Sequence, residues 1–147
     1  MRLGQPLGFV LLDLDDFKAV NDEYGHQQGD VVLREVARAM RRACRDIDIP
    51  ARYGGEELAV ILPGADLDGA YELAERVRLG VEALRVPRLE GEGVIQVTAS
   101  LGVSAVPTTA NDGAALVAGA DAALYRAKRD GKNRSARAVV AGVVSAE

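Results

Sequence analysis

The stretch RYGGEELAVILPG, residues Arg52 to Gly64, places two glycines and two glutamates directly before an apolar run. Leu58–Leu62 has the length and composition of a buried strand, so Glu56 and Glu57 stand where that strand begins. Residues 49–53, on the other side of the glycine pair, have the composition of a partner strand. Two glycines can both adopt the positive φ that a two-residue primed turn requires. The stretch therefore predicts a β-hairpin closed by the glycine pair.

Further strands and several helices are predicted on both sides of this hairpin, from apolar runs and from apolar residues at helical spacing. The expected segments are a strand at 9–13, helices at 17–25 and 27–45, hairpin strands at 49–53 and 57–62, a helix from 66 or 68 to 84, a long or bent strand at 94–106 and a helix at 112–131. This order predicts one α+β domain over residues 1–147. We expect a mixed central sheet of the ferredoxin-like or palm type, flanked by helices that pack on one face. Residues 135–147 are expected to form an edge strand or a tail.

Composition narrows the class of protein and its partners. The chain has 147 residues and a net charge of −4, with no block of basic residues, so a nucleic acid polymer is not an expected partner. Cys44 is the only cysteine, which excludes a disulfide framework and indicates a reducing, cytoplasmic location. Apolar runs reach about five residues, far below the roughly 20 that span a bilayer. We therefore expect no membrane contact by this domain.

Two carboxylates are expected to meet at one end of the sheet. Asp13 ends the first predicted strand, and Glu56 stands where the hairpin enters the sheet. Carboxylates packed this closely raise each other's pKa unless a cation lies between them. Mg²⁺ suits such a site, because it takes one or two protein carboxylates together with waters and substrate phosphates. The alternative is that these acids are solvated turn residues, as most Asp and Glu are.

Several motifs taken together closely resemble the GGDEF family of diguanylate cyclases, which condense two GTP molecules into cyclic di-GMP. The motifs are LDLDDFKAVND, YGHQQGD, GGEEL and DAALYRAKRDGKNR, and the resemblance extends from about residue 9 to residue 134. The chain departs from the family pattern in two places. It starts too late to contain the short helix and LTGLxNRR-like segment that usually open the family domain. Its signature ends in Leu58 instead of phenylalanine, an apolar exchange that should alter packing more than chemistry.

The resemblance implies a two-metal type of phosphoryl transfer. Asp13, the backbone carbonyl of Leu14 and Glu56 match the residues that hold Mg²⁺ (or Mn²⁺), and Glu57 lies beside the metals. Glu56 is also the family's candidate for accepting the proton of the 3′-hydroxyl, a duty that would compete with metal binding. Lys128 would reach the triphosphate. We therefore assign Glu56, Glu57 and Lys128 as the catalytic residues that the resemblance implies.

The resemblance also implies contacts to the rest of GTP. The backbone N–H groups at the start of the first helix would cradle the β- and γ-phosphates, Lys132 would add a second cation, and a carboxylate with an amide would read guanine. Each also has a plain structural reading as a helix cap, a surface polar residue or a solvated helix-end lysine. The residues implied are Asp16, Phe17, Lys18, Asn21, Asp30, Lys128 and Lys132.

A second, separate site is implied by the RDID motif. Arg45 and Asp48 form an RxxD pattern, and five residues separate Asp48 from Gly54, as in the family's inhibitory product site. There the arginine would bind the O6/N7 edge of a cyclic di-GMP guanine, and the aspartate would accept from its N1/N2 edge. The alternative is a charged helix end before a strand. Thr98, Ser100 and Gly102 match a strand signature of the family, and we expect them to serve packing.

The function expected from the resemblance is a diguanylate cyclase with product inhibition. Each 3′-hydroxyl must attack the other α-phosphate, which requires a two-fold homodimer with GTP between its halves. An upstream sensor domain is expected in the full-length protein, which a membrane segment could tether. One rival is a non-catalytic sensor domain that binds GTP or cyclic di-GMP and regulates a fused partner. Another is a different palm-type nucleotide cyclase, which would need other base-reading residues.

Overall fold

A five-stranded mixed sheet with helices against it forms the molecule, as the computed structural model describes it for residues 4–140. The predicted α+β class is therefore confirmed. The elements in chain order are β1 (Leu7–Leu14), α1 (Phe17–Tyr24), α2 (His26–Ala43), β2 (Ile49–Arg52), β3 (Glu57–Pro63), α3 (Leu67–Glu82), β4 (Val86–Pro87), β5 (Val94–Ile95), β6 (Ala99–Val106), α4 (Gly113–Arg129) and β7 (Ser135–Arg137).

Strand β1 lies at the centre of the main sheet, whose order is β2-β3-β1-β6-β7. It pairs antiparallel with β3 on one side and with β6 on the other, and β7 runs parallel to β6 at the edge. Because β1 ends where β3 and β6 begin, the last residues of β1 and the first of its neighbours share one end of the sheet. We call this the catalytic end, after the role that the sequence leads us to expect for it. Residues 141–147 of the expected tail lie outside the described residues.

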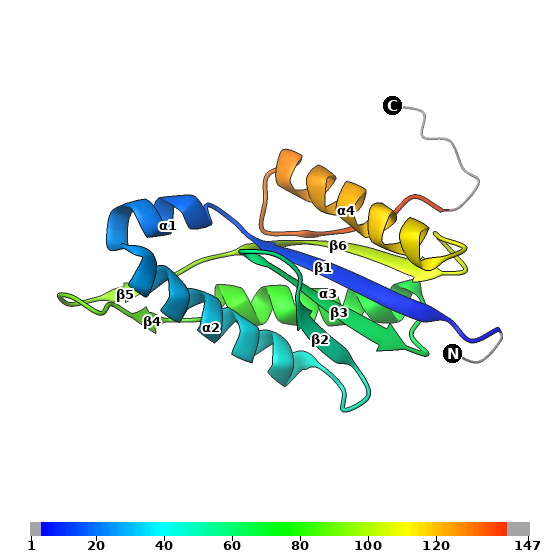
Figure 1. Ribbon diagram of the computed structural model, residues 1–147, viewed down its shortest axis with the longest axis horizontal. Coiled ribbons are helices and arrows are strands. Elements are labelled where there is room, and N and C mark those ends of the chain that lie inside the picture. The colour runs from blue at the N-terminus through cyan, green and yellow to red at the C-terminus, as the bar shows by residue number, and fades with distance from the viewer. Residues whose placement is uncertain (1–3, 141–147) are drawn as a thin grey trace.

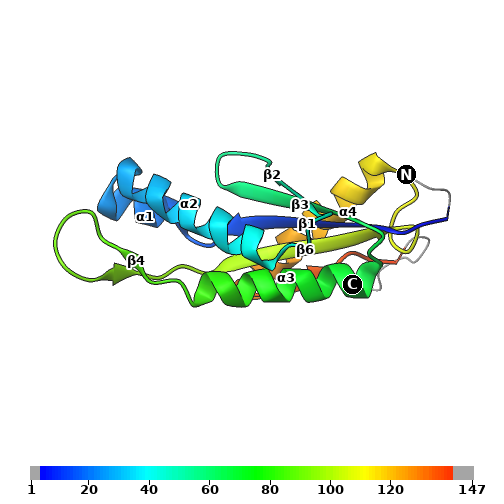
Figure 2. The same ribbon diagram turned by 90° about the horizontal axis from the view of Figure 1, so that it is seen from below.

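Helices cover both faces of the sheet, so the expectation of helices on one face is wrong (Figures 1 and 2). Val10 and Leu12 of β1 point toward α2 and α3 and belong to the larger hydrophobic cluster. Phe9 and Leu11 alternate with them and pack on the opposite face, in a smaller cluster with Leu116 and neighbouring residues of α4. The physical reason is the continuous apolar run in β1, since a strand without alternation is apolar on both sides.

The segment expected as one long strand at 94–106 is divided. β5 pairs with β4 in a separate two-stranded sheet, whereas β6 begins at Ala99 and joins the main sheet. Gln28, a buried side chain of α2, holds the small sheet in place, because its Oε1 accepts a 2.7 Å hydrogen bond from the backbone N–H of Leu89. The small sheet and α1 lie beyond one end of the main sheet (Figure 1).

The hairpin of β2 and β3 is confirmed, but its turn is not the expected primed turn. Neither Gly54 nor Gly55 has a positive φ. The backbone N–H of Tyr53 instead donates to the Glu57 carbonyl at 2.9 Å, which leaves a three-residue loop of Gly54, Gly55 and Glu56. The loop therefore carries Glu56 itself, directly before β3.

Helices α3 and α4 begin where aspartates supply caps. The side chains of Asp66 and Asp112 accept hydrogen bonds of 2.8 Å from the backbone N–H groups of Gly69 and Ala115. Such caps satisfy donors that the first turn of a helix leaves unpaired. Within residues 4–140, no helix has both the length and the apolar character needed to cross a bilayer.

Candidate active site at one end of the sheet

Three acidic side chains gather at the catalytic end. Asp13 of β1 stands opposite Glu57 in the β1–β3 register, and Glu56 precedes Glu57 in the glycine loop. The pKa of Asp13 is raised from 3.8 to about 6. Burial is the largest cause, and the nearby charges of Glu56 and Glu57 add to it, whereas Lys128 acts in the opposite direction. The predicted meeting of Asp13 with Glu56 is therefore present in the structure.

The oxygen atoms at this end suit a divalent cation. Oδ1 of Asp13 is buried and has no hydrogen-bond partner, so beyond the Lys128 ammonium, 3.7 Å away, it has acceptor capacity open to a further cation. Mg²⁺ and Mn²⁺ prefer such oxygens, and the Leu14 carbonyl lies one residue further along. Among residues 4–140, however, no three Asp, Glu, His or Cys side chains form a ready-made metal cluster. An ion here would therefore depend on Asp13, Glu56, the Leu14 carbonyl and oxygens from outside the protein.

Lys128, near the end of α4, reaches into the same site. Its Nζ donates to the Leu14 carbonyl at 3.0 Å and to Oδ1 of Asp15 at 2.9 Å, and it lies 3.7 Å from Oδ1 of Asp13. The lysine therefore stands beside the oxygens that would hold a metal, and it supplies a fixed positive charge at the catalytic end.

Asp15 is a residue that the sequence interpretation did not single out. Its carboxylate accepts from the hydroxyls of Thr98 and Ser100, both at 2.7 Å, so the expectation that these two residues serve only packing is wrong. Burial alone would raise the pKa of Asp15, but hydrogen bonds from Ser100, Thr98, Lys128 and Asn133 outweigh it and hold the pKa below its usual value. Asp15 follows the end of β1, so strand alternation does not place its side chain, and no local pattern in the sequence indicated its partners.

The start of α1 lies beside a second lysine. Asp16 occupies the N-cap position with φ 57° and no side-chain cap, and its carboxylate binds Lys132 Nζ at 2.7 Å. The N–H groups of the first turn of α1, including those of Phe17 and Lys18, lack partners within the helix and can bind an anion. The side chain of Lys18 points outward and pairs with Asp22 at 2.8 Å. The predicted cradle thus has its backbone donors, with Lys132 nearby.

A cavity of about 400 Å³ lies between α2 and the hairpin. Asp30 lines it, together with Arg34, Arg52 and the apolar side chains of Leu33, Ala37 and Leu58. Asn21 lies close to this position, because a Cβ on Gly29, the neighbour of Asp30, would overlap the Asn21 Oδ1. Only glycine therefore leaves room for the Asn21 side chain there. Of the predicted base-reading pair, Asp30 thus lines the cavity and Asn21 lies beside the neighbouring Gly29.

Arg45 and Asp48 form an ion pair at the opposite end of β3. Nη2 and Nε of Arg45 donate to Asp48 Oδ1 at 2.7 and 3.0 Å, and the backbone N–H of Arg45 donates to Oδ2 at 2.7 Å. The Asp48 side chain is fully buried. A cavity of about 330 Å³ adjoins the pair, and Arg76 of α3 lines it. Arg76 is a second cation that the sequence interpretation missed, because no local pattern connects it with residues 28 positions earlier.

Comparison of the chain with models of protein families identifies its family. The family model described as "Diguanylate cyclase, GGDEF domain" matches residues 1–134. The chain belongs to the GGDEF family.

Named relatives agree with this assignment. The chain is 42% identical over 130 residues to the response regulator PleD of Caulobacter vibrioides, covering 88% of this chain and 29% of PleD. It is 44% identical over 136 residues to the diguanylate cyclase VdcA of Vibrio cholerae, covering 91% of this chain and 40% of VdcA. This GGDEF chain thus spans less than half the length of either relative.

Solved structures show the same fold. The crystal structure of the GGDEF domain of DgcB from Caulobacter crescentus, in complex with cyclic di-GMP, matches with a TM-score of 0.84 and 34% sequence identity. The match covers 91% of this chain and 78% of the DgcB chain. The palm-like fold of GGDEF domains is therefore also the fold of this chain.

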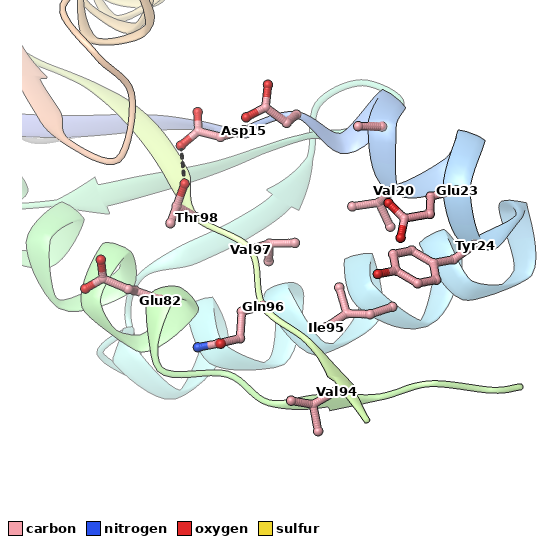
Figure 3. Close-up of a pocket in the computed structure, with 12 residues that line it drawn as sticks. Asp15, Val20, Glu23, Tyr24, Glu82, Val94, Ile95, Gln96, Val97 and Thr98 are labelled. Atoms are coloured by element: carbon pink, nitrogen blue, oxygen red, sulfur yellow. Dashed lines mark hydrogen bonds between the residues drawn. The ribbon is translucent and has the colours of Figure 1, made fainter. Parts of the chain in front are cut away.

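A further cavity of this GGDEF domain, of about 500 Å³, lies between α1 and residues 94–98 (Figure 3). Its lining includes the carboxylates of Asp15, Asp16, Glu23 and Glu82 and contains no Lys or Arg. This charge disfavours phosphate groups, and of the residues expected to bind GTP only Asp16 lines the cavity.

Proposed function

We propose that this GGDEF domain is a diguanylate cyclase that condenses two GTP molecules into cyclic di-GMP and releases two pyrophosphates. The observation that carries the proposal is the catalytic end of the sheet, where Asp13, Glu56 and Glu57 gather beside Lys128. Acids that suit a divalent cation, next to a fixed lysine and an anion-binding helix start, form a site for a nucleoside triphosphate.

The residues of this chain would divide the work of binding GTP. Lys128 and Lys132 would neutralise part of the triphosphate charge, and the first N–H groups of α1 would donate hydrogen bonds to its β- and γ-phosphates. Bound Mg²⁺ or Mn²⁺, held by Asp13, Glu56 and the Leu14 carbonyl, would polarise the α-phosphate and lower the pKa of the 3′-hydroxyl. Glu56 would accept the proton of that hydroxyl, and Glu57 would keep the site negatively charged.

Guanine selectivity would come from the cavity at Asp30. Guanine presents two donors, N1–H and the N2 amino group, which suit the Asp30 carboxylate and the Asn21 amide oxygen. Adenine has a lone pair at N1, which the carboxylate would repel. The apolar wall formed by Leu33 and Leu58 would contact the base faces.

The reaction would require two copies of this chain. One domain would hold one GTP, and each 3′-oxygen must attack the α-phosphorus of the other GTP, with pyrophosphate leaving in line. A two-fold homodimer, with its catalytic ends facing each other, satisfies this geometry.

Product inhibition would take place at Arg45 and Asp48. The Arg45 guanidinium is held by Asp48, so binding a guanine of cyclic di-GMP would require this ion pair to open or to share its donors. Arg76, which lines the same cavity, would offset the phosphate charge of the product.

The test is to incubate the purified chain, at several protein concentrations, with Mg²⁺ and either GTP or ATP, and to separate the products by chromatography. We expect cyclic di-GMP from GTP alone, at a rate that rises more than linearly with protein concentration. Glu56→Gln should lower this rate by about 100-fold or more, because it removes both a metal ligand and a proton acceptor. Glu90→Gln, an exposed glutamate between β4 and β5, is the matched control and should retain activity.

A silent wild-type chain calls for a second arm, in which a fused parallel coiled coil forces two copies together. Product that appears only in the fusion supports the proposal and shows that pairing limits the reaction. A fusion that binds GTP but forms no product contradicts it and supports a non-catalytic sensor. Conversion of ATP would instead support another palm-type cyclase.

A further inference from the structure

The carboxylate of Asp15 has every acceptor position filled. Oδ1 accepts from Ser100 Oγ at 2.7 Å and from Lys128 Nζ at 2.9 Å, and Oδ2 accepts from Thr98 Oγ1 at 2.7 Å and from the backbone N–H of Asn133 at 3.0 Å. The side chain is only 1% exposed. Figure 3 shows Asp15 at the end of β1 with its hydrogen bond to Thr98 on the neighbouring segment.

The four donors come from two parts of the chain that are both distant from Asp15. Thr98 directly precedes β6 and Ser100 lies at the start of that strand, whereas Lys128 lies near the end of α4 and Asn133 in the turn that follows α4. Two of the donors are hydroxyl groups, and a hydroxyl can rotate so that it accepts a hydrogen bond instead of donating one. The ammonium group of Lys128 and the N–H of Asn133 can only donate.

Lys128 is the donor whose position matters for chemistry. Its Nζ is held between Asp15 and the Leu14 carbonyl, which fixes the charge 3.7 Å from Asp13 Oδ1. A free lysine has about 2 kcal/mol of rotamer entropy, so an anchored lysine loses less of it on binding a phosphate. A buried carboxylate is otherwise unfavourable, so its presence here calls for a role.

We propose that Asp15 is a positioning residue, which acts through Lys128 and holds that lysine in place for the triphosphate of GTP. This inference rests on the proposed function, and it adds a residue that does not itself touch the substrate. Its defining consequence is selective: loss of Asp15 weakens binding of the triphosphate and leaves recognition of the guanine unchanged.

Asp15→Asn removes the negative charge that holds Lys128, which we call its anchor, and the side chain keeps nearly the same shape. An amide offers one oxygen and one NH₂ group, and each oxygen position of Asp15 faces one donor that cannot accept, either Lys128 or Asn133. In either amide orientation one of these contacts is lost, and the charge of the anchor is lost in both. Lys128 is therefore held less firmly, because it loses a charged partner in both orientations and the hydrogen bond itself in one of them.

The test compares the affinities of two ligands by calorimetry in Mg²⁺. One is guanosine 5′-[(α,β)-methylene]triphosphate, which cannot release pyrophosphate, and the other is GMP. Asp15→Asn should weaken the triphosphate analogue by about tenfold, the loss expected for one charge-assisted hydrogen bond, with GMP changed less than about twofold. The affinity ratio is the affinity for the triphosphate analogue divided by the affinity for GMP. When Lys128 is already replaced by alanine, Asp15→Asn should cause no further change in this ratio.

Ser100→Ala is the matched structural control. It removes one hydrogen bond from the same carboxylate but leaves the contact with Lys128, so it should lower the melting temperature without altering the affinity ratio. If Asp15→Asn does not fold, Asp15→Glu takes its place, because the added methylene displaces the carboxylate while the charge is kept. Asp15→Glu should lower the ratio as well.

The outcomes separate this inference from the proposed function. If Lys128→Ala weakens the triphosphate analogue but the Asp15 variants change the ratio no more than Ser100→Ala does, Asp15 is merely structural and the inference is overturned. If Lys128→Ala itself leaves the ratio unchanged, the assignment of Lys128 to the triphosphate fails, and the role of Asp15 fails with it.

Discussion

Asp13 ends the central strand among charges of both signs. Burial and Glu56 raise its pKa to about 6, whereas the same group in an unfolded chain has its ordinary value near 4. Between these two values the folded protein holds a proton that the unfolded chain has released. The free energy of unfolding therefore falls as the pH rises through this window, and the loss is complete above the folded pKa.

Asp13→Asn should remove this loss. The quantity to compare is the free energy of unfolding of the variant minus that of the wild type, with a chelator present. This difference should be larger at pH 7.5 than at pH 4.5 by about 1–2 kcal/mol. Urea denaturation at the two pH values measures the difference, and Asp121→Asn, an exposed acid of α4, is the control. A gain of equal size at both pH values would show that Asp13 does not titrate in this window.

At the residue scale, the sequence predicted that the acidic side chains meet at one end of the sheet, but it did not predict the hydrogen bonds that orient the groups around them. Asp13 and Glu56 stand in short motifs next to apolar runs, so spacing alone brings them to one end of a sheet. Asp15 belongs to the same motif, yet its partners lie between residues 98 and 133, and no local pattern indicates them. Hydrogen bonds formed across such separations are set by the packing of elements, which a single sequence does not state.

Helix α4 approaches the sheet more closely than any side chain would allow. A Cβ on Gly102 of β6 would overlap the carbonyl oxygen of Ala120 and lie 2.6 Å from the backbone nitrogen of Leu124. Both contacts are with backbone, which cannot rotate away. The packing role predicted for Gly102 thus has a specific cause, which is the close approach of backbone to backbone.

Gly102→Ala should therefore force α4 away from the sheet and lower the free energy of unfolding by about 1–3 kcal/mol, the range seen for overpacked sites. Gly113→Ala is the matched control, because a Cβ on Gly113 meets nothing within 4 Å. Chemical denaturation compares the two variants. Equal stabilities would mean that α4 adjusts without strain.

Two errors at the scale of elements have different origins. The run FVLL in β1 lacks polar alternation, and this pattern already indicated two buried faces, so the expectation of helices on one face overlooked a readable signal. The turn at Gly54 and Gly55 is different. Paired glycines permit a primed turn without requiring one, and here Arg52 donates to the carbonyls of both glycines, which favours a wider loop.

At the scale of the whole molecule, the two candidate sites lie at opposite ends of β3. Glu57 opens the strand at the catalytic end, and Arg45 donates to the carbonyl of Pro63 at the other end. Six residues of extended chain separate the two by about 20 Å. A ligand bound at Arg45 therefore cannot fill the GTP site of the same copy, and inhibition would act through the placement of neighbouring domains.

Arg45→Ala should raise the cyclic di-GMP concentration that halves the cyclase rate by about tenfold or more, because a bidentate, charge-assisted contact with guanine is lost. Arg42→Ala, an exposed arginine in the last turn of α2, is the control and should leave this concentration unchanged. The measurement is the rate at increasing concentrations of added product. Unaltered inhibition in Arg45→Ala would exclude this site.

The bonds around Asp15 also bear on how the protein is made. The Asp15 carboxylate has all its donors only when Asn133 reaches it, 118 residues later. During synthesis β1 emerges before the other strands of the sheet, whereas Lys128 and Asn133 follow Asp15 by 113 and 118 residues. A growing chain thus has Asp13, Glu56 and Glu57 long before it has the cation beside them. The arrangement proposed for this end of the sheet is therefore completed only by α4 and the turn that follows it, the parts of this site that are synthesised after all the others.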